Sequence, residues 1–222
     1  MKKILLALVL ALGITGATAH HETPIQALYE WGDTYVWSVK HLNEDGTKDT
    51  GYMSHGSGVW LDDTTMVTAC HVTSGEDVVF ATFNEHDEIS VDLAVEFCNQ
   101  WKDQSVMSVI VGVQRHITPV VFGAIPERGE RLYIIGFPAD NPITVTTGWF
   151  VGKSVRDVDG YEDNESWSMT ADAAGGNSGG AVVVIRDGEI QLVGILVSGY
   201  SGGNITQMKS LEYTKAWLAK LH

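Results

Sequence analysis

A serine enclosed by glycines is the most chemically informative feature of the sequence. Residues 175–180 read Gly-Gly-Asn-Ser-Gly-Gly, with the serine at position 178. A serine hydroxyl becomes a useful nucleophile only when a neighbouring base removes its proton. Its attack on a carbonyl creates an oxyanion, and glycines let the backbone turn sharply and present N–H groups to that charge. The pattern indicates a nucleophilic Ser178, with the N–H groups of Gly176 and Ser178 as the expected oxyanion hole.

A histidine at the end of an apolar run is the expected base. Residues 68–72 read Thr-Ala-Cys-His-Val, so the histidine is His71. The other seven histidines lie near the ends of the expected mature chain, or near turns and polar stretches. Imidazole accepts and returns a proton near neutral pH, which is what a serine nucleophile requires. The sequence therefore pairs His71 with Ser178.

These two segments resemble the histidine and nucleophile boxes of trypsin-like serine proteases. They are closest to the bacterial Deg-type branch, in which asparagine commonly precedes the serine, as Asn177 does here. Residues 129–138 (Gly-Glu-Arg-Leu-Tyr-Ile-Ile-Gly-Phe-Pro) and 56–59 (Gly-Ser-Gly-Val) resemble two further stretches of that branch. The resemblance covers residues 50–200. It implies an all-β, chymotrypsin-like fold of two six-stranded antiparallel β-barrels with a C-terminal α-helix and the active site between the barrels.

The same resemblance implies a serine endopeptidase that hydrolyses proteins or peptides through a Ser-His-Asp triad and an acyl-enzyme, without cofactor or metal. Two aspartates compete for the third position. Asp92 fits the family's Asp-x-Ala-apolar box, but the alternation of residues 89–95 places it on the polar face of a strand. Asp103 follows a complete expected hairpin and lies 32 residues after His71, against 21 for Asp92, which agrees better with the family's spacing. The expected triad is His71, Asp103 and Ser178.

Substrate selection is harder to predict. Asp172 lies six residues before Ser178. In trypsin an aspartate at that offset selects Lys or Arg, whereas a similar segment in Deg-type enzymes is structural, so both interpretations stay open. The other expected pocket residues are Leu196, Val197, Ser198 and Gly199.

Short apolar runs separated by turns predict a β-rich chain, with 24 glycines and 44% hydrophobic residues. Only residues 208–221 show helical spacing, and they predict the C-terminal helix. The expected strands cover residues 35–40, 58–61, 66–69, 78–83, 89–97, 106–111, 131–135, 143–151, 182–185 and 191–197.

The first nineteen residues are typical of a secretory signal. Two lysines precede an apolar run, and Ala-Thr-Ala at 17–19 is a small-residue cleavage site. We therefore expect a signal peptide at 1–19, a protease domain at 20–222, and a secreted or periplasmic protein with no membrane contact after signal removal. The formal charge of −14 disfavours nucleic acid as a partner.

Two further features bear on activation and stability. Cys70 and Cys98 could form a disulfide in an exported protein, or could be buried thiols. Asn177 is uncharged where classical zymogens have an aspartate, so signal removal alone is expected to give an active enzyme. The chain continues for 44 residues after Ser178, which leaves no room for the peptide-binding module of Deg-type relatives.

Two other functions fit parts of this pattern. An α/β-hydrolase esterase also has a Gly-x-Ser-x-Gly box, but it requires the order serine, acid, histidine, and only His222 follows Ser178. A catalytically silent binding module or chaperone on the same fold would usually lack a triad member, and here all three are present.

Overall fold

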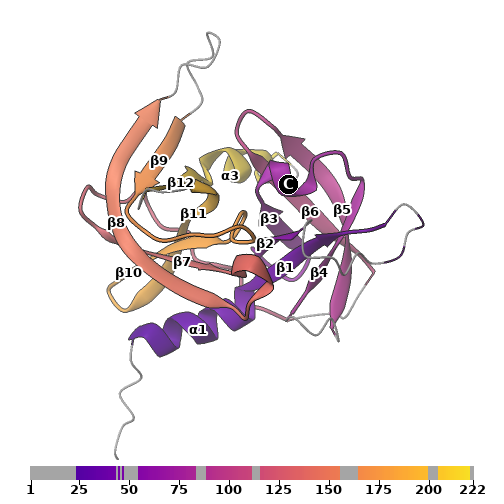
Figure 1. Cartoon of the computed structure of the whole chain (residues 1–222), viewed down its shortest axis with the longest axis horizontal. Coiled ribbons are helices and arrows are strands. Elements are labelled where there is room, and N and C mark those ends of the chain that lie inside the picture. Colours follow the sequence, from indigo (N-terminus) through magenta and orange to yellow (C-terminus); the bar gives the residue numbers. More distant parts are fainter. Residues whose placement is uncertain are drawn as a thin grey trace, which may run out of the picture.

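Short, apolar strands of this chain close into two antiparallel barrels that follow one another in the sequence (Figure 1). The computed structural model describes residues 24–43, 45, 47, 55–83, 89–111, 116–155, 165–199 and 205–220. The proposed signal peptide at 1–19 lies outside these residues. Each barrel has six strands, and a short helix follows the second barrel, so the predicted chymotrypsin-like, all-β fold is confirmed.

The first barrel has the strand order β1-β2-β3-β6-β5-β4. A hairpin about Asp62 joins the strands expected at 58–61 and 66–69: Val59 lies opposite Val67, and the Asp62 carboxylate accepts hydrogen bonds from the N–H groups of Thr64 and Thr65. Such an Asx turn reverses the chain between two buried strands. The strands are β1 Val36–His41, β2 His55–Trp60, β3 Thr65–Thr68, β4 Val78–Thr82, β5 Ser90–Asn99 and β6 Gln104–Val111.

The second barrel has the order β7-β8-β9-β12-β11-β10. A tight turn joins the strands expected at 182–185 and 191–197, with Asp187 and Gly188 both at positive φ, 52° and 81°. Two residues at positive φ are what a tight hairpin of this twist requires. The strands are β7 Arg131–Gly136, β8 Thr144–Val155, β9 Glu165–Met169, β10 Ala181–Arg186, β11 Glu189–Gly199 and β12 Thr206–Ser210.

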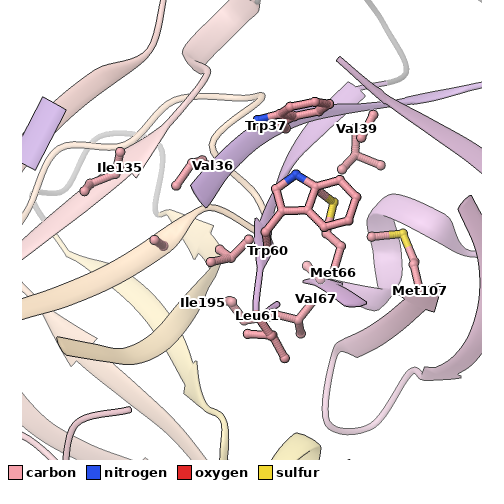
Figure 2. Close-up of a cluster of buried hydrophobic side chains, with 14 of the residues drawn as sticks. Val36, Trp37, Val39, Trp60, Leu61, Met66, Val67, Met107, Ile135 and Ile195 are labelled. Atoms are coloured by element: carbon pink, nitrogen blue, oxygen red, sulfur yellow. The ribbon is translucent and has the colours of Figure 1, made fainter. Parts of the chain in front are cut away.

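One buried cluster joins the two barrels. Trp37 and Trp60 of the first barrel meet edge to face, with ring centroids 5.5 Å apart. Ile135 and Ile195 of the second barrel belong to the same cluster, and Figure 2 shows them beside the first-barrel side chains. Protein interiors are packed densely and deform little. This shared core therefore fixes the position of one barrel against the other, which a site between them requires.

The helices differ from the sequence prediction. Residues 208–221 were expected to be helical, but Met208 lies in β12 opposite Trp167, and the helix α3 covers only Glu212–Leu218. A short apolar run fits the period of a buried strand as well as that of a helix, which is why the start was placed too early. Two helices were not predicted at all: α1, Pro24–Tyr35, and the single turn α2, Cys70–Thr73. A 3-10 turn, Pro138–Asp140, follows β7.

The two terminal helices each pack on the barrel that is distant in sequence. α1 precedes β1 but contacts β7 and β8, and a Cβ atom at Gly32 would lie 2.8 Å from side-chain atoms of Ile135 and Ile143. α3 follows β12 but packs on the first barrel through Tyr213, whose ring centroid lies 5.6 Å from that of Phe97. Each helix therefore links the barrels. No helix in these described segments is long and apolar enough to cross a membrane.

Candidate active site

His71 lies on α2, the helical turn that follows β3. The Val72 N–H donates to the carbonyl of Ala69, which starts the turn directly after the strand. A disulfide joins Cys70 to Cys98 on β5, so the choice left open by the sequence is settled in favour of the disulfide. His71 is therefore held by a covalent link at the preceding residue, while its own side chain remains 48% exposed.

Asp103 reaches His71 from the turn between β5 and β6. The Oδ2 atom of Asp103 lies 2.9 Å from Nδ1 of the His71 ring. The Oδ1 atom of Asp103 accepts a hydrogen bond from the backbone N–H of His71 at 3.0 Å. Asp103 has φ 47°, a left-handed conformation that aspartate tolerates better than most residues. The double contact fixes the ring orientation and keeps a proton on Nδ1, which leaves the lone pair on Nε2.

The other candidate aspartate lies elsewhere on the barrel. Asp92 is within β5, opposite Phe80 of β4 and Val111 of β6. The structure thus places Asp103, and not Asp92, beside His71.

The loop that carries Ser178 is docked against the strand that leads to His71. A Cβ atom at Gly179 would lie 2.1 Å from both the Ser57 carbonyl oxygen and Thr68 Oγ1, and Gly179 has φ +82°. The Ser178 carbonyl accepts the N–H of Ser57, on β2, at 2.7 Å. Glycine is needed at 179 for both the close approach and the conformation. This contact sets the nucleophile loop of the second barrel against the first.

The carbonyl groups on either side of the expected oxyanion hole are held by other parts of the chain. The Gly175 carbonyl accepts the N–H of Ala139 at 2.6 Å, and the Gly176 carbonyl accepts the Ser57 hydroxyl at 2.8 Å. In a trans peptide the N–H points away from the carbonyl, so the Gly176 N–H faces away from Ala139. Within the segments that the structure describes, the N–H groups of Gly176 and Ser178 have no acceptor. Both donors are therefore available to an incoming oxygen.

Two neighbouring hollows surround these groups. The first, of about 440 Å³, contains Ser178, and the second, of about 460 Å³, contains His71 and Asp103. Ser198 lines both, so the hollows adjoin. The His71 ring and the Ser178 hydroxyl make no hydrogen bond to each other across the described residues, and such bonds commonly form only with substrate bound.

The expected pocket residues divide between these hollows. Leu196, Ser198 and Gly199 line the hollow beside Ser178, and Val197 lines the one beside His71. Asp172 lines neither; it is exposed, and its carbonyl accepts the Thr146 hydroxyl. The remaining lining of the hollow beside Ser178 is Ala173, Ala174 and Gly175.

Three contributors were missed by sequence reasoning. The Ser57 hydroxyl donates to the Gly176 carbonyl and so supports the loop of Ser178. Its position between Gly56 and Gly58 was the sequence signal for a close approach of another segment. Ala139 anchors the Gly175 carbonyl from a left-handed conformation, φ 48°, that no sequence pattern announces. Lys209 lines the hollow of His71 and Asp103, and its strand, Thr-Gln-Met-Lys-Ser, carries no sequence signal that this lysine would be buried.

No described cluster of three or more His, Cys, Asp or Glu side chains could hold a metal ion.

Comparisons with known proteins identify the family and support the fold. The model of a family described as the trypsin-like peptidase domain matches residues 56–195. The active form of the Rv3671c protease from M. tuberculosis has a TM-score of 0.69 at 18% identity, covering 89% of this chain and 83% of that one. The inactive form has a TM-score of 0.66 at 20% identity, covering 89% and 92%. No curated protein sequence matches this chain significantly.

Proposed function

The chain belongs to the trypsin-like peptidase family and is a serine protease, and we propose that it is a secreted endopeptidase that works through His71, Asp103 and Ser178. The observation that carries the proposal is the double contact of the Asp103 carboxylate with the backbone and ring of His71. That contact leaves Nε2 as the proton acceptor, in the hollow adjoining the one that contains Ser178.

The chemistry follows from these positions. His71 Nε2 takes the proton of Ser178 as Oγ bonds to the scissile carbonyl carbon, and the oxyanion is bound by the N–H groups of Gly176 and Ser178. The intermediate collapses to an acyl-enzyme, the C–N bond breaks, and the imidazolium gives its proton to the leaving amine. Water then attacks the acyl carbon with His71 again as the base, the bond from that carbon to Ser178 Oγ breaks, and the imidazolium returns its proton to Oγ as the acid product leaves. Asp103 stabilises the imidazolium throughout.

Export is the second part of the proposal. Residues 1–19 form the proposed signal, which would leave a domain at 20–222 in the periplasm or outside the cell. The Cys70–Cys98 disulfide supports this location, because such bonds persist in oxidising compartments. The proposed partners are proteins or peptides, and the charge of −14 argues against nucleic acid.

The hollow beside Ser178 favours an uncharged residue before the scissile bond. Its wall of Ala173, Ala174, Leu196 and glycines offers small apolar surfaces, and Asp172 is not among the lining residues. A buried cation without an anionic partner is unfavourable. We therefore expect small or medium apolar side chains at this position, in place of the Lys or Arg that Asp172 would select.

Cleavage of a mixed peptide library by residues 20–222 tests the proposal, with Ser178→Ala as the control. We expect cleavage after apolar residues by the parent and a loss of about a million-fold in kcat in the variant. Labelling of Ser178 by a serine-directed phosphonate gives a second readout. Absence of both cleavage and labelling would reject the enzyme and favour a silent binding module or chaperone, while cuts after Lys or Arg would restore the role of Asp172.

A further inference from the structure

A buried lysine lies next to the proposed triad. Lys209, on β12, is only 5% exposed, which is unusual for a residue of this kind. It lines the hollow that contains His71 and Asp103. It also lines a second hollow, of about 380 Å³, together with Lys102, Gln104 and Glu165. Its side chain thus borders both hollows, one of which it shares with the Asp103 carboxylate.

The surroundings of Lys209 hold the ammonium in place. Nζ donates to the backbone carbonyl of Glu165, on β9, at 2.9 Å. Burial lowers the pKa of Lys209 below its usual range, and the largest opposing influence is attraction to the Asp103 carboxylate. The other charged or titratable groups near Lys209 or α2 are Lys102, Lys153, Glu165, Glu212, Tyr213, His41 and Glu76.

We propose that Lys209 is a positioning residue for the triad, whose positive charge attracts the Asp103 carboxylate and repels the imidazolium form of His71. This inference rests on the proposed function of His71 as general base. A cation beside the Asp103–His71 pair attracts the carboxylate and repels the imidazolium, and the reduced dielectric of a buried site strengthens both effects. The formal charge of −14 acts in the opposite direction, because a negative protein favours the imidazolium. Lys209 offsets that negative field at the Asp103–His71 pair, and so extends the activity of the enzyme toward acid pH.

The sign of the expected effect follows directly. Only enzyme with neutral His71 can accept the serine proton, so kcat/KM falls on the acid side as His71 becomes protonated. Removal of a nearby positive charge makes protonation easier. The acid limb of the Lys209→Met variant therefore shifts to higher pH, by about half a unit for one charge at the distance of a neighbouring side chain, or about threefold lower kcat/KM on that limb. Lys209→Arg retains the charge and keeps the parent's limb.

The experiment measures pH profiles of kcat/KM for the parent, Lys209→Met, Lys209→Arg and Lys220→Met. The last variant removes one exposed cation after α3 and controls for net charge alone. A shift in Lys209→Met with none in Lys209→Arg or Lys220→Met supports the proposal. Equal limbs in a folded Lys209→Met, checked by thermal melting, overturn it and leave Lys209 as a structural tie between β12 and β9.

Two NMR titrations complete the test. The first does not depend on catalysis, and the second does not depend on the folding of Lys209→Met. The first follows the His71 ring in the four proteins and should show the same pattern even if no peptide is cleaved, so a failure of the proposed function remains distinguishable. The second follows the Lys209 ammonium in the parent and in Asp103→Asn. Because coupling between two charges is reciprocal, the ammonium should titrate at lower pH once Asp103 is neutral. An unchanged lysine titration overturns the proposal.

Discussion

The two barrels contribute to the site with different kinds of groups. The first barrel provides side chains: His71 on a turn stapled by a disulfide, and Asp103 on the next hairpin. The second provides Ser178 and a run of backbone donors on a loop in which a Cβ atom at Gly179 would collide with its neighbours. In the first barrel, activity should therefore respond most to substitutions that change the chemical group of a side chain and keep its size. In the second barrel, activity should respond most to substitutions that add atoms to the loop of Ser178 without adding a reactive group.

Within the first barrel, the largest effect of a change of chemistry at nearly constant size is expected for Asp103→Asn. An amide can orient the ring in the wrong tautomer and cannot stabilise the imidazolium, so kcat should fall about ten-thousandfold with the fold intact. Asp92→Asn is the matched control and should cleave like the parent. Steady-state kinetics on one peptide measures both, and equal losses in the two variants would remove Asp103 from the triad.

Gly179→Ala tests the second half. The added methyl would lie 2.1 Å from two oxygens and would stand on a backbone with φ +82°, so we expect kcat to fall at least a hundredfold, together with lower stability. Gly129→Ala shares the positive φ, +85°, but meets no atom within 4 Å. The difference between the two variants in kcat and melting temperature isolates the collision. Similar losses in both would mean that strain, and not space, explains this glycine.

The disulfide gives a smaller effect that belongs to the first barrel. Cys70→Ala with Cys98→Ala should lower the free energy of unfolding by about 2–4 kcal/mol, and should reduce kcat moderately because the turn bearing His71 loosens. Denaturant unfolding and kinetics measure the two quantities. Reduction of the parent should reproduce both changes, and a stable, fully active double variant would show that the bond does not position His71.

An ion pair away from the site should give the smallest effect. Arg186 on β10 holds the Glu130 carboxylate with two contacts of 2.8 Å, and this hydrogen bonding lowers the pKa of Glu130. Stability from a carboxyl of lowered pKa is present above its unfolded value and is lost as the pH falls through the folded value. Arg186→Met should cost about 1 kcal/mol near neutral pH and less below pH 4. Urea unfolding at both values checks this, with cleavage rates expected to match the parent's.

Much of this arrangement could be read from the sequence, for identifiable reasons. Strand alternation located the barrels and placed Asp92 on the wrong face, and the glycine box marked Ser178. Local patterns could not reveal contacts between distant segments. The Ser57 hydroxyl meets the Gly176 carbonyl across 119 residues, and Ala139 meets the Gly175 carbonyl from a separate turn. α1 was missed although Leu28 and Trp31 lie one turn apart, because its partners are on β7 and β8.

The crossed packing of the terminal helices has a consequence for dividing the chain. α1 belongs in sequence to the first half but packs on β7 and β8, whereas α3 belongs to the second half but packs on Phe97. A cut in the exposed connection at Ala124 or Ile125 would give two fragments, each carrying a helix that the other needs. The two fragments would therefore have complementary packing surfaces. We expect each fragment to be inactive alone and a mixture of the two to regain cleavage of the same peptide; a mixture that stays inactive would show that the crossed helices do not suffice to reassemble the protease.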